Sequence, residues 1–240
     1  MNRQFAPSAS PRLLVSVRDA LEAEAVAAAG RCLVDAKDAG SGALGALPTG
    51  AVQRIVAAVR GRCATSAVAG EPETWEELLQ RVASTAGTGV DMVKVAWPGV
   101  GGAADNTIRD GLRSLPCPVV AVFFAEMRPS VDNVAAAVRA GFRGAMIDTC
   151  RKDGRNLLDH LSTTELHAFV DACRRHGVMS GLAGSLRIGD VPILGPLSPS
   201  FIGFRGGLCR GRDREAQLDP DRIADAFAAL DALRKAEHAS

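Results

Sequence analysis

The chain has 240 residues, of which 47% are hydrophobic and 23% are charged, a balance typical of a packed globular protein and not of a disordered chain. Its 28 basic and 27 acidic residues leave a formal net charge of +1, so the composition favours neither nucleic acid nor an anionic membrane surface as a partner. The six scattered cysteines contain no CxxC pair, which argues against a zinc site or a disulfide framework and favours a reducing compartment.

The first eleven residues, MNRQFAPSASP, are polar and contain proline and serine, without the apolar segment of a secretory signal. We therefore expect a flexible tail over residues 1–11 and a single catalytic domain over residues 12–240. No run of residues approaches the roughly 18 apolar positions of a membrane span. These features predict a cytoplasmic protein.

Short apolar runs then alternate with longer alanine-rich amphipathic stretches, a pattern typical of repeated strand-helix units. The predicted strands cover residues 13–17, 32–37, 63–68, 92–97, 119–125, 145–150, 179–184 and 201–206. The predicted helices lie near residues 19–29, 50–60, 74–85, 104–115, 130–140, 163–176 and 219–236, with a single turn near 190–197. Thr74 with Glu77, and Ser162 with Glu165, have the spacing of a capping box at two helix starts.

Eight strands joined by helical crossovers predict an α/β protein folded as a single (β/α)8 TIM barrel. A doubly wound open sheet is the alternative, and it is less favoured because no GxGxxG follows the first strand. In a TIM barrel the chemistry lies at the C-terminal ends of the strands.

Lysine is rare in this sequence, and its few positions are informative. Three of the four lysines fall in or just after predicted strands: Lys37, Lys94 and Lys152, whereas Lys235 lies in the last helix as an expected surface charge. Arginine stays protonated near neutral pH, but a lysine that is desolvated and crowded by cations can become the free amine that attacks a carbonyl. The three lysines therefore predict a Schiff-base enzyme.

Two carboxylates accompany these lysines. Asp35 lies two residues before Lys37 and shares its strand face, and Asp148 faces the same side of its strand as Cys150. If both faces point into the barrel mouth, two carboxylates join the three amines. The alternative is that these are structural salt bridges, and Lys94, in the middle of a strand, is the lysine that fits this alternative best.

Glycine-rich loops follow the last two strands, in GLAGSLRIGD (181–190) and GFRGGLCRGRDR (203–214). Such loops bind phosphate in many barrels, because glycine lets backbone N–H groups approach the ligand closely. The predicted phosphate-binding residues are Gly184, Ser185, Arg205, Gly206 and Gly207. Glycine is also an ordinary turn residue, and the loop at 38–46 could equally close over a substrate or only route the chain. Weaker candidates near strand ends are Ser16, Ser66, Glu71 and Glu126.

With these residues in place, the sequence resembles the (5-formylfuran-3-yl)methyl phosphate synthase family of methanofuran biosynthesis. The segments that carry the resemblance are LLVSVRDALEAEAVAAAG, VDAKDAGSGALGA, DMVKVAW, GAMIDTCRKDGRNLLDHL, GLAGSL and GFRGGLC. The resemblance implies a TIM barrel that joins two molecules of glyceraldehyde 3-phosphate, with loss of phosphate and water. It places the Schiff base on Lys37, its neighbouring carboxylate on Asp35, and acid–base support on Lys94, Asp148 and Lys152. It implies no metal and no organic cofactor.

The alanine- and arginine-rich helices suit a bacterium that makes a methanofuran-like cofactor for one-carbon metabolism. The alternatives are a class I aldolase or triose phosphate isomerase-like enzyme, and a non-catalytic phosphosugar-binding barrel. An imine aldolase needs one nucleophilic lysine, so it should tolerate loss of Lys94 or Lys152, whereas a binding barrel has no need of lysines at strand ends. The expected partner is a small-molecule triose phosphate, and the outer helices are compatible with a homo-oligomer.

Overall fold

The computed structural model describes residues 10–98, 106–151 and 153–238, and the side chains as far as Lys235. The eight strands are β1 (Arg12–Val17), β2 (Leu33–Ala36), β3 (Ala64–Val68), β4 (Met92–Ala96), β5 (Val119–Phe124), β6 (Gly144–Asp148), β7 (Met179–Leu182) and β8 (Phe201–Phe204). All neighbouring strands are parallel, and β8 pairs with β1 to close the barrel. The predicted TIM barrel is confirmed, and the closed sheet rules out the doubly wound alternative.

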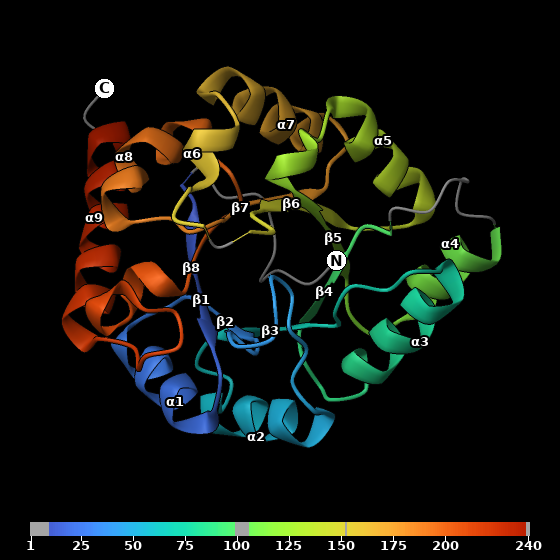
Figure 1. The fold of residues 1–240 in the computed structure, drawn as a ribbon, viewed down its shortest axis with the longest axis horizontal. Helices are drawn as coiled ribbons and strands as arrows, with labels where there is room; N and C mark the ends of the chain where they lie inside the picture. The colour runs from blue at the N-terminus through green and yellow to red at the C-terminus, as the bar shows by residue number, and fades with distance from the viewer. Residues whose placement is uncertain (1–9, 99–105, 152, 239–240) are drawn as a thin grey trace.

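The helices surround the barrel (Figure 1). They are α1 (Ala20–Ala29), α2 (Thr49–Val59), α3 (Trp75–Ala86), α4 (Asn106–Ser114), α5 (Val131–Ala140), α6 (Leu157–His160), α7 (Thr163–Arg175), α8 (Val191–Leu194) and α9 (Pro220–His238). Short 3-10 turns are η2 (Ala125–Met127), η3 (Ile188–Asp190), η4 (Gly195–Leu197), η5 (Gly206–Leu208) and η6 (Arg210–Arg212). Across these described segments, no helix is both long enough and apolar enough to cross a membrane.

Helix starts follow the predicted caps at two positions, with one difference. Ser162 accepts from the backbone N–H of Glu165, whose carboxylate returns to the N–H of Ser162, so α7 begins with the predicted capping box. Thr74 accepts from the N–H of Glu77 at 3.1 Å, but the Glu77 carboxylate accepts from Glu73 instead. The cap of α3 by Thr74 is therefore confirmed. The return bond to the Glu77 carboxylate comes from the N–H one residue before the predicted position.

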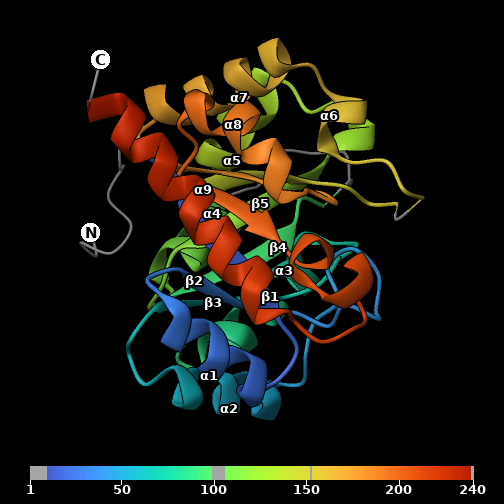
Figure 2. The ribbon, with the colours of Figure 1, turned by 90° about the vertical axis from the view of Figure 1, so that its left-hand side faces the viewer.

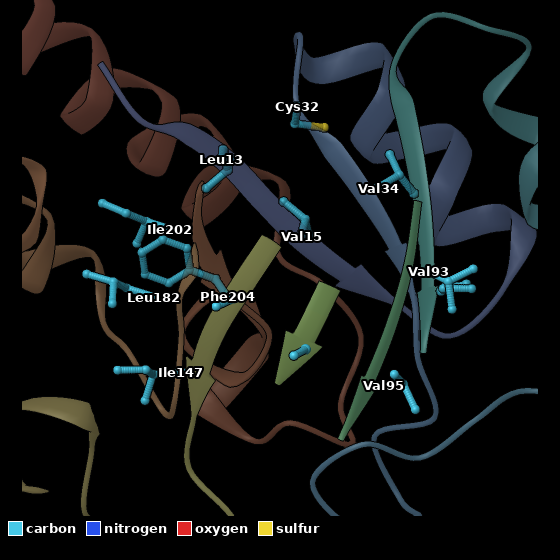
Figure 3. Packing of buried hydrophobic residues seen from close by; sticks show 14 of the residues in the cluster. Leu13, Val15, Cys32, Val34, Val93, Val95, Ile147, Leu182, Ile202 and Phe204 are labelled. Atoms are coloured by element: carbon cyan, nitrogen blue, oxygen red, sulfur yellow. The ribbon is translucent and has the colours of Figure 1, made fainter. Parts of the chain in front are cut away.

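Alternation along the strands separates two apolar cores. Val15, Val34 and Ile147 point outward and pack against the helices (Figure 3). Leu14, Leu33, Met92 and Met146 point inward with their neighbours and fill the barrel interior. Because side chains two apart share a face, the next inward positions after Leu33 and Met92 are Asp35 and Lys94. The polar residues of the site thus continue the interior column toward the C-terminal ends of the strands.

Candidate active site

A cavity of about 330 Å³ lies at the C-terminal end of the barrel. Its size falls in the range of small-molecule sites. Lysine and aspartate from the strands form one part of its lining, and the loops after β7 and β8 form the other. The lining includes Ser16, Lys37, Lys94, Asp148, Gly184, Ser185, Arg187, Arg205, Gly206, Gly207, Arg212, Asp213 and Arg214. Eight of the ten predicted site residues are therefore among those that line one cavity.

Lys37 and Asp148 meet across the barrel mouth. They come from the ends of β2 and β6, which are opposite strands of the closed sheet. The Lys37 Nζ donates to Asp148 Oδ2 at 3.2 Å, and both residues are more than nine-tenths buried. Thr149 N–H donates to the other carboxylate oxygen at 2.8 Å, which fixes the carboxylate plane. An amine and a carboxylate in direct contact thus face the cavity together.

Lys94 and Asp35 form a second, deeper pair. Lys94 Nζ donates to Asp35 Oδ2 at 2.8 Å, with exposed fractions of 2% for Lys94 and 0% for Asp35. Ser16 and Ser66, the register neighbours of Asp35 on β1 and β3, donate to the same carboxylate at 2.9 and 2.7 Å. Three donors therefore hold Asp35, as a buried carboxylate requires.

The pairing differs from the simplest interpretation of the sequence. Asp35 and Lys37 share a face, yet the carboxylate in contact with Lys37 is Asp148, while Asp35 contacts Lys94. Two residues along a strand separate side chains by roughly 6.6 Å, which favours partners on other strands. The alternative of a buried ion pair holds for Lys94. Lys152 lies outside the described residues.

The loop after β7 has an unusual backbone at its start. Gly184 has a φ of +119°, and a Cβ there would lie 2.7 Å from Thr149 Cγ2, so both conformation and space require glycine. Ser185, the next residue, has a φ of 51°. Both residues line the cavity beside the Asp148 segment.

The loop after β8 approaches the β7 loop closely at Gly207. A Cβ on Gly207 would lie 2.3 Å from the Leu186 carbonyl oxygen, whereas a Cβ on Gly206 would meet its nearest atom, the Arg212 oxygen, at 3.4 Å. Only Gly207 is therefore required by backbone packing, and the turn-residue alternative fits Gly206 better.

We expect Gly207→Ala to destabilise the protein by about 1–3 kcal/mol, because the new methyl group forces the two loops apart. It should also weaken ligand binding in the cavity, since both loops line it. Gly206→Ala is the matched control and should change the free energy of unfolding by less than about 0.5 kcal/mol. Urea unfolding of both variants measures the difference, and equal losses would contradict the close packing at Gly207.

Arg205 lines the cavity, but its guanidinium is already occupied. Its five N–H groups donate to the two Glu22 carboxylate oxygens and to the carbonyls of Ser16, Arg214 and Ala216. In this arrangement every N–H of the guanidinium already has a partner, and phosphate binding by Arg205 stays a prediction. Arg205 anchors the β8 loop to α1.

Three further arginines, which the sequence did not single out, also line the cavity: Arg187, Arg212 and Arg214. Arginine is the common surface cation of this chain, so the position of an arginine in the sequence does not by itself indicate a site. Arg214 also donates to the Gly42 carbonyl oxygen at 2.8 Å, which ties the β8 loop to the 38–46 loop; the two loops lie side by side in Figure 2. Asp38 and Gly45 form an antiparallel bridge within the latter.

The four weaker candidates, Ser16, Ser66, Glu71 and Glu126, form hydrogen bonds that position residues at the C-terminal end of the barrel. Ser16 and Ser66 hold Asp35, and Glu71 accepts from the N–H of Leu44 in the 38–46 loop. Glu126 accepts from the N–H groups of Cys150 and Arg151, each at 2.9 Å. Burial alone would raise the pKa of Glu126, but these two donors, a further backbone hydrogen bond and the nearby His160 together lower the pKa. Glu126 thus stays ionised and anchors the segment after Asp148.

A closed (β/α)8 barrel with an amine–carboxylate pair facing a cavity between glycine-rich loops defines the class of TIM-barrel enzymes that act on small molecules. Within this class, the chain belongs to the 4-HFC-P synthase family, whose model matches residues 13–227. The resemblance inferred from the sequence is therefore confirmed.

Relatives from archaea and bacteria carry the name of one enzyme. A (5-formylfuran-3-yl)methyl phosphate synthase from Methanopyrus kandleri is 34% identical over 221 residues, covering 85% of this chain and 92% of the relative. A protein from Methylorubrum extorquens, which bears the same name in provisional form, is 50% identical over 232 residues and 97% of both chains.

Solved structures with the same fold are distant in sequence. Phosphoribosyl anthranilate isomerase from Thermus thermophilus superposes with a TM-score of 0.65 at 15% identity, over 93% of this chain and all of that one. KGPDC from Streptococcus mutans gives a TM-score of 0.63 at 10% identity, over 93% of this chain and 99% of that one. These likenesses support the barrel fold alone.

Proposed function

We propose that this protein is a cytoplasmic lyase that condenses two molecules of glyceraldehyde 3-phosphate to (5-formylfuran-3-yl)methyl phosphate through an imine on Lys37. The product would enter the biosynthesis of methanofuran or a methanofuran-like one-carbon cofactor. The observation that carries the proposal is the Lys37 amine, which lines the cavity in contact with Asp148 in a chain of this family.

The first step is imine formation. The unprotonated Lys37 amine attacks the carbonyl carbon of one triose phosphate, and water leaves as the C=N bond forms. Asp148 lies within hydrogen-bond distance of the amine and is the group best placed to carry the proton that moves between nitrogen and oxygen. The protonated imine then withdraws electrons from the adjacent carbon.

The second step joins the two trioses. Removal of a proton from the carbon beside the imine gives an enamine, whose carbon attacks the aldehyde of the second triose phosphate. Elimination of phosphate, ring closure and dehydration follow, and the imine is hydrolysed to release Lys37. The atoms balance when two trioses give one furan phosphate, one phosphate and two waters. Aromaticity makes the last step favourable.

Lys94 and Asp35, the deeper pair in the barrel interior, support this chemistry electrostatically. Their mutual contact and burial keep one positive and one negative charge fixed beneath the cavity, and Lys94 is also part of its lining. We assign Lys94 to stabilising the negative charge that develops on substrate oxygens. Lys152, by family resemblance, takes a further proton-transfer role.

Phosphate binding is assigned to the loops after β7 and β8. Gly184, Ser185, Gly206 and Gly207 bring the backbone to the cavity, and Arg187 and Arg214 bring positive charge in addition to that of Arg205. Arginine favours phosphate because its planar fork of N–H groups matches two oxygens.

Borohydride trapping with glyceraldehyde 3-phosphate tests the proposal, with a furan absorption band followed in a parallel unreduced reaction. Trypsin does not cut after an alkylated lysine, so an adduct on Lys37 should convert the peptide 32–37 into the longer peptide 32–54. The adduct together with the furan band supports the synthase. An adduct without the band would indicate an aldolase, and binding without any adduct would indicate a phosphosugar-binding barrel.

A further inference from the structure

Cys32 and Cys63 lie side by side at the N-terminal end of the barrel, opposite the cavity. They directly precede Leu33 and Ala64, which are partners in the register of β2 and β3; Figure 3 shows Cys32 at the start of its strand. Neighbouring strands run about 4.8 Å apart, within the Cα separations of about 4.4–6.8 Å that a disulfide spans. Both cysteines are free thiols, with their sulfurs 3.7 Å apart.

The surroundings of the pair favour a negative charge on one sulfur. The Cys32 thiol donates to Cys63 Sγ, and this bond lowers the pKa of Cys63 while it raises that of Cys32. Arg62 and Arg31 lower the pKa of Cys63 further through their charge. In its neutral form Cys63 donates to the Gly30 carbonyl oxygen at 3.2 Å. Ionisation removes this hydrogen bond, and the thiolate is then stabilised by the Cys32 thiol donor and by the two arginines.

Two other buried cysteines, Cys117 and Cys173, have pKa values shifted in the opposite direction. Burial raises the pKa of Cys117 to about 11 and that of Cys173 to about 12. A thiolate is the reactive form of cysteine, so these two behave as inert apolar residues. Cys63 differs from them because it combines a thiol donor with neighbouring cations.

We propose that Cys32 and Cys63 form a peroxide-oxidisable cysteine pair that closes to a disulfide between the starts of β2 and β3. The Cys63 thiolate attacks one oxygen of hydrogen peroxide, the O–O bond breaks, and hydroxide leaves, which gives a sulfenic acid. Cys32 then attacks that sulfur, the S–O bond breaks, and water leaves with the Cys32 proton. Two thiols and one peroxide thus give one disulfide and two waters.

The bond would join residues that are distant in the chain but already adjacent in the fold. It should raise the thermal unfolding midpoint, because the crosslink restricts the unfolded chain more than the folded one. The pair lies at the end of the barrel away from Lys37, so the oxidised protein should keep its cavity and its capacity to bind inorganic phosphate.

Peptide mapping after limited peroxide treatment tests this proposal on the intact protein. Trypsin cuts after Arg31 and Arg62, so Cys32 and Cys63 begin the peptides 32–37 and 63–81, each of which contains a single cysteine. We expect these peptides to appear joined, to separate with dithiothreitol, and to form before a comparable fraction of the exposed Cys150 is oxidised.

Cys63→Ser should abolish the joined peptide, and Cys173→Ser should leave it unchanged as the matched control. The thermal midpoint should rise on oxidation of the wild type and fall back on reduction. Recovery of both peptides as separate alkylated thiols, under peroxide that fully oxidises Cys150, would overturn the proposal. This comparison within the wild-type protein decides the question even if a serine variant fails to fold.

Discussion

Lys37→Arg is expected to abolish furan formation, with a fall in kcat of more than about 10³-fold. Arginine keeps the positive charge beside Asp148 and a side chain of similar length, so the contact between β2 and β6 has a replacement donor. It does not supply the neutral amine that an imine requires. Steady-state kinetics on glyceraldehyde 3-phosphate measure the effect, and borohydride should no longer attach the triose to the protein.

Two controls separate chemistry from folding in this experiment. Lys235→Arg makes the same substitution on the exposed side of α9 and should keep full turnover. Inorganic phosphate should bind Lys37→Arg as tightly as wild type, because the proposed phosphate loops are unaltered. Retention of turnover by Lys37→Arg would exclude the imine mechanism while leaving the family assignment intact.

The barrel was predictable because its signals are local. Alternation of inward and outward side chains and the count of eight apolar runs depend on neighbouring residues, and the eight strands match the predicted ones to within two residues at each end. The helix α6 was not predicted because its four residues are too few to show a helical period. Its cap, Asn156, was the available signal.

The site was predictable in its residue types and less so in its contacts. The rarity of lysine drew attention to Lys37 after β2 and Lys94 within β4, but which carboxylate contacts which amine depends on how the sheet closes. The contact of Lys37 with Asp148 crosses from β2 to β6, and no spacing in the sequence encodes it. The contact of Arg205 with Glu22 was unpredictable for the same reason, since the two residues lie 183 positions apart.

Lys94→Met is expected to reduce the free energy of unfolding by about 3–5 kcal/mol. Methionine fills a similar volume, but it leaves the Asp35 carboxylate buried without its cation, with only Ser16 and Ser66 as donors. Urea unfolding measures the loss. Lys235→Met is the matched control on the exposed face of α9 and should change stability by less than about 0.5 kcal/mol.

The double variant Asp35→Asn/Lys94→Met separates two effects of Lys94→Met: the Asp35 carboxylate that is left without its cation, and the loss of the Lys94 side chain itself. Removing both charges leaves no uncompensated ion, and the amide introduced in place of the Asp35 carboxylate keeps its shape and part of the hydrogen bonding to the serines. We expect the double variant to be more stable than Lys94→Met by about 2 kcal/mol, whereas simple additivity of two losses would contradict a buried ion pair.

The activity of the double variant is the second readout. An imine aldolase with Lys37 as its only essential lysine would retain turnover. The synthase should lose it, because the charge assigned to stabilise substrate oxygens has gone. Stability recovered without activity would therefore identify the Lys94 charge as part of the chemistry and not only of the fold.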